Sequence, residues 1–181
     1  MNFGEAQQDM RRAYYDGATG VIVSATVWLI AALVAWQSTP RSAIGALLIG
    51  GMFIFPLSVA LSKLLGRSGV HSKENPLSPL ATTCTLWMLL VIPLAYGVSL
   101  HKIEWFFPAM MLIIGGRYLT FAILYGLRTY YFFGAVLSVA GITLVVLKAP
   151  TPMSAFSGAV VEYIFAFFIF LKAKNGSRAA F

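Results

Sequence analysis

The sequence contains little charge, a single cysteine and none of the common catalytic motifs, and these absences argue against several classes of protein. Charged residues make up 10% of the 181 residues, whereas soluble domains contain about 25%. The single cysteine, Cys84, excludes an intramolecular disulfide and a cysteine-rich metal site. No G-x-S-x-G, H-E-x-x-H or Walker sequence occurs. We therefore expect no enzyme framework, no cofactor and no metal site.

What the chain has in abundance is apolar side chains. Hydrophobic residues make up 59% of the sequence, more than a soluble domain of this length needs for its core. The surplus must face lipid. The net charge of +7 does not indicate a nucleic-acid binder, because the basic residues are scattered singly between apolar runs and form no basic face. The lipid bilayer is therefore the expected partner, and nucleic acid is not.

Six apolar runs follow a polar leader, and each is close to the ~20 residues that cross a bilayer as a helix. Strands of alternating polarity, typical of an outer-membrane barrel, are absent from the sequence. We predict an all-α polytopic bundle of six transmembrane helices, with antiparallel neighbours where connections are short. The runs are Gly20–Trp36, Ala43–Leu61, Ala81–Leu100, Trp105–Tyr125, Tyr130–Leu147 and Met153–Leu171.

Three parts of the chain can be distinguished by composition. Residues 1–19 form a polar leader that is too acidic for a signal peptide, and we expect an interfacial helix there. Residues 20–171 form the membrane domain, and residues 172–181 form a basic tail. Hydroxyl–proline pairs at Thr39-Pro40, Ser78-Pro79 and Thr151-Pro152 predict helix starts, each with a capping hydroxyl before the proline.

The basic residues between the runs predict the orientation. With the N-terminus in the cytoplasm, nine Lys or Arg residues lie on the cytoplasmic side and three on the other side. An excess of this kind favours both termini in the cytoplasm, and we expect a multi-pass protein of the inner (plasma) membrane. The nine are Arg11, Arg12, Lys63, Arg67, Lys73, Arg128, Lys172, Lys174 and Arg178, and the three are Arg41, Lys102 and Lys148.

Several segments resemble an uncharacterised family of small bacterial multi-pass membrane proteins over roughly residues 1–130. They are MNFGEAQQDMRRAYY, GGMFIFPLSVALSKLLGR, NPLSPL, IPLAYGVSL and EWFFPAMMLIIGGRYLTFAILYGLR. That family has no established activity. The resemblance therefore implies a location and a topology, and it assigns no residue a role.

Two charged residues lie deep inside apolar runs, Arg117 and Glu162. A charge at the bilayer centre costs about 2.5–3.5 kcal/mol on insertion scales, so each needs a partner, a hydrated cavity or a use. Arg117 lies about 18 Å below Trp105 and Glu162 about 14 Å below Met153. Because both helices run in the same direction, the two charges are expected at a similar depth near the midplane.

The neighbours of these charges suggest where they face. Glu162 shares a helical stripe with small residues, so it should face a neighbouring helix. Arg117 shares a small polar flank with Thr120 and Gly116. Two interpretations stay open for the pair: an ion pair that joins the two helices, or a site for a solute or proton. The stripe contains Ala155, Gly158, Ala159 and Ala166.

Three functions are compatible with these features. The first is a small-solute or proton-coupled transporter with a midplane Arg/Glu site, for which a homodimer is expected, since six helices are few for a complete path. The second is a structural or accessory protein in which the pair clasps two helices. The third is an intramembrane lipid-modifying enzyme. Helix kinks or a cavity lining are predicted at Gly50, Gly51, Pro56, Pro93, Gly115, Gly116 and Thr120.

His101 and Glu104 are three residues apart and are the remaining candidates for a metal pair. Two ligands are too few for a structural metal site without further help. A solvated interfacial pair is the expected interpretation. The sequence names no soluble partner.

Overall fold

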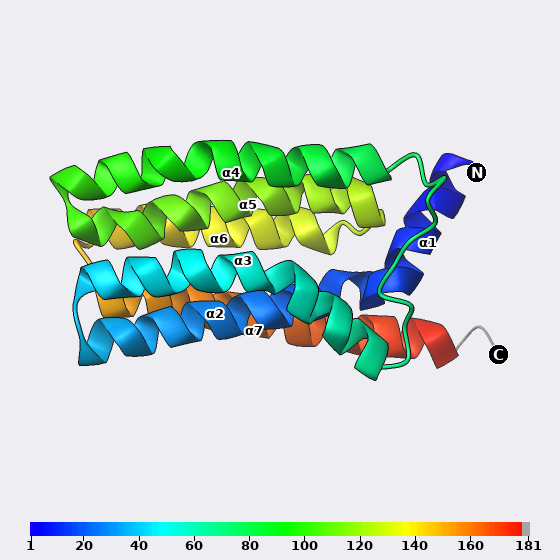
Figure 1. The fold of residues 1–181 in the computed structure, drawn as a ribbon, viewed down its shortest axis with the longest axis horizontal. Helices are drawn as coiled ribbons and strands as arrows, with labels where there is room; N and C mark the ends of the chain where they lie inside the picture. The colour runs from blue at the N-terminus through cyan, green and yellow to red at the C-terminus, as the bar shows by residue number, and fades with distance from the viewer. Residues whose placement is uncertain (179–181) are drawn as a thin grey trace.

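The computed structural model describes residues 1–178, and residues 175–178 are described by their backbone alone. Six long helices form the body of the structure (Figure 1), and six candidate spans are long and apolar enough to cross a membrane. This confirms the prediction of an all-helical polytopic membrane protein. The six helices are α2 (Ala18–Gln37), α3 (Pro40–Leu64), α4 (Ser78–His101), α5 (Phe106–Tyr125), α6 (Thr129–Val146) and α7 (Thr151–Arg178).

Three shorter elements complete the described chain. They are the N-terminal helix α1 (Phe3–Tyr14) and the single turns η1 (Tyr15–Gly17) and η2 (Ile103–Trp105). The last helix, α7, continues to Arg178, so the predicted basic tail begins inside a helix. Residues 179–181 of that tail lie outside the described residues.

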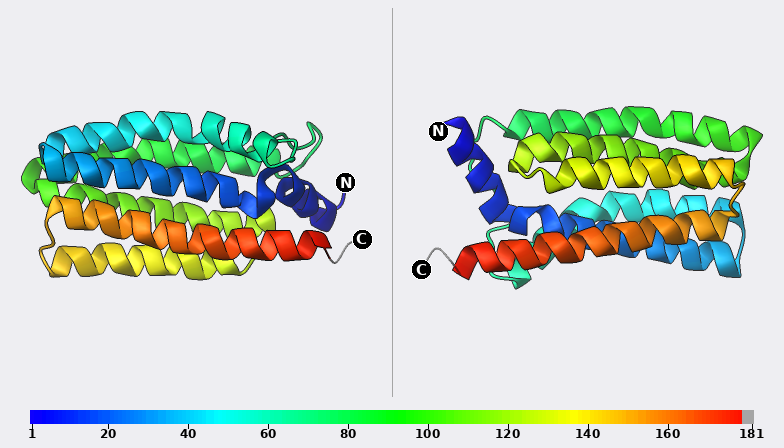
Figure 2. Two further views of the ribbon diagram at one scale, coloured as in Figure 1. Left: turned by 90° about the horizontal axis from the view of Figure 1, so that it is seen from below. Right: turned by 180° about the vertical axis from the view of Figure 1, so that it is seen from behind.

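The six long helices are arranged as two layers of three. In one layer α2 lies between α3 and α7, and in the other α5 lies between α4 and α6. Figures 1 and 2 show the layers as two stacked rows of helices. The helices that follow one another through short connections inside a layer, α2–α3, α4–α5 and α5–α6, are antiparallel neighbours, as predicted.

Aromatic rings fill the space between the layers, which we call the seam. Trp28 of α2 packs edge-on against Phe107 of α5, with ring centroids 5.6 Å apart. Phe133 of α6 stacks on Phe165 of α7 at 4.3 Å. Large rings hold the two layers further apart than the small residues inside a layer do, and they leave the interior of the seam apolar.

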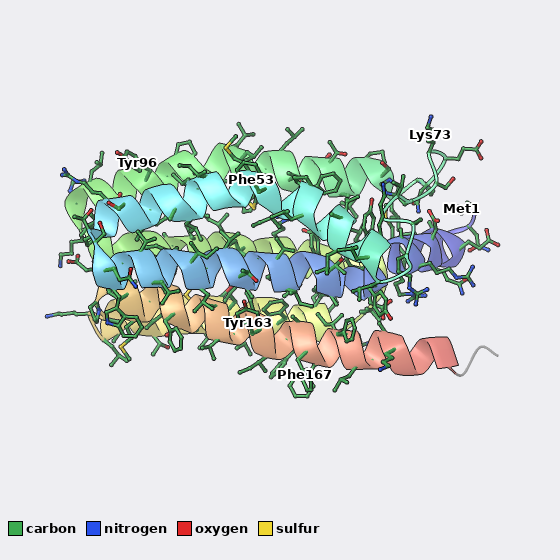
Figure 3. All side chains as sticks on the ribbon, turned by 60° about the horizontal axis from the view of Figure 1, so that its bottom comes forward. Met1, Phe53, Lys73, Tyr96, Tyr163 and Phe167 are labelled. Carbon is green, nitrogen blue, oxygen red and sulfur yellow. The ribbon has the colours of Figure 1, made fainter. Side chains whose placement is uncertain are left out.

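The outer helices α3 and α4 present mainly apolar side chains to their surroundings. Phe53 of α3, Tyr96 of α4 and Phe167 of α7 point away from the bundle (Figure 3), and about half or more of each side chain is exposed. An apolar surface of this extent needs lipid around it. The arrangement is that of a protein whose interior is narrow and whose surface faces a bilayer.

Both termini lie at the same end of the bundle, which we call the N/C end (Figure 1). Helix α1 lies across this end and begins with a capping box in which Asn2 and Glu5 exchange backbone–side-chain hydrogen bonds. Its residues Ala6, Met10 and Ala13 are buried against the bundle. The polar leader is therefore a packed part of the fold.

Two side chains of α1 bind the last carbonyl groups of α5. Gln7 donates to the carbonyl oxygen of Ile123 at 2.7 Å, and Arg11 donates to that of Tyr125 at 3.0 Å. The last four carbonyls of a helix have no partner inside the helix. Basic side chains are favoured there because they also complement the negative end of the helix dipole. Helix α1 thus serves as a cap for α5.

The connection between α3 and α4 joins the same cap. Asp9 of α1 accepts hydrogen bonds from the backbone N–H of Ser72 and from the side chain of Asn75. Asn75 also donates to the carbonyl oxygen of Ala6 and is buried. These contacts explain how a long polar connection stays ordered over the end of an apolar bundle.

Of the three predicted helix starts, one has the predicted capping geometry. The Thr39 hydroxyl accepts from the backbone N–H of Ser42 at 3.2 Å, with Pro40 in the first turn. At the start of α4, Leu77 is the N-cap residue and Ser78 already belongs to the helix. The reason is that the Asn75 side chain accepts from the N–H of Leu77 and begins the turn earlier. Helix α7 likewise includes Thr151.

The capping of α5 by α1 can be tested by mutation. Arg11→Ala should lower the free energy of unfolding by about 1.5–3 kcal/mol, because it removes a charged hydrogen bond to a backbone carbonyl. Arg12, the next residue, is exposed, so Arg12→Ala is the matched control and should stay within about 0.5 kcal/mol of the parent. Thermal unfolding in detergent measures both. Equal losses in the two variants would contradict the capping role.

Candidate functional site

Glu162 lies inside the bundle, on the face of α7 that packs against α2. The stripe of small residues predicted around it is buried, and the Glu162 side chain itself is 0% exposed. Gly158, one turn before Glu162, lies directly against the ring of Trp28 on α2. Because a side chain at position 158 would collide with this ring, the glycine is what allows α2 and α7 to approach so closely.

One oxygen of the Glu162 carboxyl group has a hydrogen-bond partner and the other has none. The hydroxyl of Tyr118 on α5 donates to Oε1 at 2.9 Å. Ser24 of α2 lies close enough to interact with the carboxyl group, yet Oε2 has no hydrogen-bond partner among the described residues. A buried carboxyl oxygen without a partner is costly. The site is therefore polar but incompletely satisfied.

Aromatic rings surround the hydroxyl that binds Glu162. The ring of Tyr118 stacks on Phe133 at 4.0 Å, and Phe133 stacks in turn on Phe165 at 4.3 Å. Phe165 lies on α7, nearly one turn after Glu162. The three rings, which we call the aromatic stack, connect α5, α6 and α7. The carboxyl group thus lies in an apolar environment with one oriented donor.

The side chain of Arg117 is directed toward α4. Its two terminal nitrogens lie 3.5 Å from the hydroxyl of Thr85 and 3.4 Å from the sulfur of Met88. Its guanidinium group lies over the ring of Phe121 at 5.0 Å, an attractive cation–π arrangement. Its Nε atom has no hydrogen-bond partner in the part of the chain that the structure describes.

The structure does not contain the predicted ion pair between Arg117 and Glu162. Consecutive residues of a helix point about 100° apart, and on α5 it is Tyr118 that faces α7 while Arg117 faces α4. The sequence predicts the depth of Arg117 and Glu162 in the membrane, but it does not predict how α5 is rotated about its own axis. A role of either residue in binding a substrate stays a prediction.

The glycines and prolines singled out in the sequence lie outside this site. Gly50 packs against α2 and Gly115 against α6, so these two allow close contacts between neighbouring helices of a layer. Gly116 lies beside Trp87 of α4 at ordinary contact distance. Thr120 is half-buried on α5. The other three candidates, Gly51, Pro56 and Pro93, are exposed on α3 and α4.

Metal-ligating residues do not gather in the described part of the chain. No group of three or more His, Cys, Asp or Glu side chains occurs among the described residues. His101 and Glu104 are both exposed at the end of the bundle opposite the N/C end. His71 is hydrogen-bonded to the hydroxyl of Tyr14 at 2.9 Å, within the cap.

Two residues of the site, Ser24 and Tyr118, were not predicted from the sequence. Both are neutral, whereas the signal in the sequence was a charge inside an apolar run. Ser154 is fully buried, and its hydroxyl lacks a hydrogen-bond partner in the described structure. It precedes Glu162 by eight residues, about 12 Å along α7. Ser154 therefore lies outside the site, and no pattern on α7 points to Tyr118 or Ser24.

Comparison with known proteins places the chain in a family. A family of unknown function, DUF7010, matches residues 3–172. The chain therefore belongs to this family, in agreement with the resemblance to an uncharacterised membrane-protein family. No curated protein and no solved structure matches the chain.

The geometry of the site predicts which residue pairs are energetically coupled. In a double-mutant cycle, Tyr118→Phe and Glu162→Leu should show a coupling energy of about 0.5–3 kcal/mol, because each change alone removes the buried hydrogen bond that the two side chains share. Arg117→Gln and Glu162→Gln should be more nearly additive, since no contact joins them. Unfolding in detergent of the parent, single and double variants measures both cycles. A larger coupling energy in the cycle of Arg117 and Glu162 would contradict this prediction and would indicate an ion pair between them.

Proposed function

We propose that this member of the DUF7010 family is a proton-coupled carrier of a small solute, in which Glu162 is the proton-binding group. The observation that carries the proposal is the fully buried Glu162 carboxyl group, which has one unpaired oxygen and lies in the seam between the two layers. An ionisable residue inside a membrane is expensive and is by default a candidate functional site.

The surroundings of Glu162 suit a group that gains and loses a proton. An ion pair would hold the carboxyl group permanently charged, but the side chains that interact with it at short range, Tyr118 and Ser24, are neutral. When Glu162 is ionised, Oε1 accepts the Tyr118 hydrogen. When it is protonated, the free oxygen carries the added proton. Arg117 acts on this step only through its charge and without a contact, because its contacts are with α4 and with Phe121.

A line of tyrosines leads from Glu162 toward the N/C end. The rings of Tyr118 and Tyr130 are 5.9 Å apart, and those of Tyr130 and Tyr125 are 5.5 Å apart. The Tyr130 hydroxyl donates to the carbonyl oxygen of Asp16 at 2.8 Å, in the turn that joins α1 to α2. Hydroxyl groups along this line supply a path for protons once the seam takes up water.

The two-layer arrangement supports alternating access. Carriers commonly operate by the rocking of one helix group against another around a site near the midplane. The layers here meet through aromatic rings, while the closest backbone contacts lie inside each layer. We also propose that two copies act together, since six helices are few for a complete path.

A second candidate function is structural. The hydrogen bond between Tyr118 and Glu162 joins α5 in one layer to α7 in the other, so it acts as a neutral clasp between the layers. In this interpretation the only function of the Glu162 carboxyl group is to accept the hydrogen bond from Tyr118. Glu162→Gln retains an acceptor of nearly the same shape, so a clasp would survive that change.

The test uses purified protein in liposomes that contain a pH-sensitive dye. Amino acids, sugars, carboxylates, monovalent metal cations and lipophilic cations are added outside, one class at a time. We expect at least one class to change the internal pH with the parent protein and not with Glu162→Gln. Glu104→Gln is the control, because it removes a carboxylate that is exposed outside the seam; it should respond as the parent does.

The stability of the same variants separates the two functions. Glu162→Gln should abolish the pH response while it leaves the unfolding temperature close to that of the parent. A response that persists in Glu162→Gln, or the absence of any response from folded and reconstituted parent protein, would rule out the carrier and leave the clasp.

A further inference from the structure

A groove runs between α6 and α7 on the outside of the bundle. Its volume is about 640 Å³, within the range of ~300–1,000 Å³ that small-molecule sites occupy. Seven of the nine residues that line it are Val, Ile or Phe, and the two polar ones, Thr129 and Lys172, come from the first residue of α6 and the far part of α7. Because α6 and α7 are antiparallel, both polar residues lie at the N/C end.

The length of the groove corresponds to one leaflet of a bilayer. Along α7 it extends from Val161 to Lys172, which at 1.5 Å per residue is about 16 Å. Half of the ~30 Å hydrocarbon core is about 15 Å. Helix α7 extends past the start of α6 at the N/C end (Figure 2), so the polar end of the groove is open. An acyl chain that enters there would end near the middle of the membrane.

The charge at the open end favours an anion. Lys172 and Arg128, the residue before Thr129, are both exposed. Asp16 interacts electrostatically with Lys172, but it also interacts more strongly with Arg11 and Arg67, so Lys172 is not neutralised by it. Basic pockets between transmembrane helices commonly bind anionic lipid headgroups.

We propose that this groove binds one anionic phospholipid of the leaflet at the N/C end. One acyl chain lies along the apolar lining, and the phosphate group is held by Lys172. The lipid would lie beside the candidate site, because Val161 and Phe165, which precede and follow Glu162 on α7, both line the groove. Phe165 also belongs to the aromatic stack, so the bound chain supports the ring that packs toward Tyr118.

The first experiment compares two lipids on delipidated protein in detergent. Phosphatidylglycerol and phosphatidylethanolamine with identical acyl chains are titrated, and binding is followed by native mass spectrometry and by the unfolding temperature. We expect the parent to prefer phosphatidylglycerol. Lys172→Gln should reduce its affinity about fivefold, the factor that corresponds to ~1 kcal/mol for one basic residue near a headgroup. Lys174→Gln removes the same charge two residues away, outside the groove, and should retain the preference.

The second experiment fills the groove. Val136→Trp places a large ring in the lining, whereas Val139→Trp places the same ring on the exposed side of α6. We expect the first variant to lose the bound lipid and the second to keep it. Equal binding of the two lipids by the parent, equal losses in the two lysine variants, or lipid retention in Val136→Trp would each overturn the proposal. So would a dimer of the parent that Val136→Trp dissociates, because the groove would then bind a second copy.

Discussion

The close packing of α2 against α7 is the constraint on which the rest of the structure depends. Small residues on α7 and the notch at Gly158, which receives Trp28, bring the two backbones together. The side chain of α2 that interacts with the Glu162 carboxyl group is the small Ser24. The carboxyl group must therefore turn to the other layer, where Tyr118 supplies its hydrogen bond. A helix contact made of small residues thus decides the chemistry of the site.

The two intramembrane charges are accommodated in different ways. Arg117 is half-buried and is stabilised by several weak contacts with Thr85, Met88 and Phe121. Glu162 is fully buried and has one good hydrogen bond. Neither residue contacts an opposite charge in the described structure, and an unpaired charge at this depth is costly. Each residue therefore needs its own explanation, and the incompletely satisfied carboxyl group is the stronger candidate for a function.

The helices and their order follow from the sequence, whereas the contacts between them do not. Apolar runs of bilayer length predict all six spans, and the small-residue stripe predicts the buried face of Glu162. The spans are apolar all round, so the sequence gives little indication of which face of the other helices is inside. For this reason the rotation of α5, which separates Arg117 from Tyr118, could not be predicted. Helix α1 docks on the bundle through Ala6, Met10 and Ala13, which have helical spacing. Its polar contacts, such as the hydrogen bond from Arg11 to the carbonyl oxygen of Tyr125, follow from no periodic pattern.

Phe165 connects the outside of the bundle with its interior. One part of its side chain lines the groove between α6 and α7, and its ring also stacks on Phe133, which stacks on Tyr118. Tightly packed rings transmit a displacement because the interior has no free volume to absorb it. A chain that fills the groove restrains Phe165, and through two ring contacts it restrains the hydroxyl that binds Glu162. A lipid bound in the groove would therefore be coupled to the carboxyl group in the seam through these ring contacts, and its binding would alter the free energy of the site.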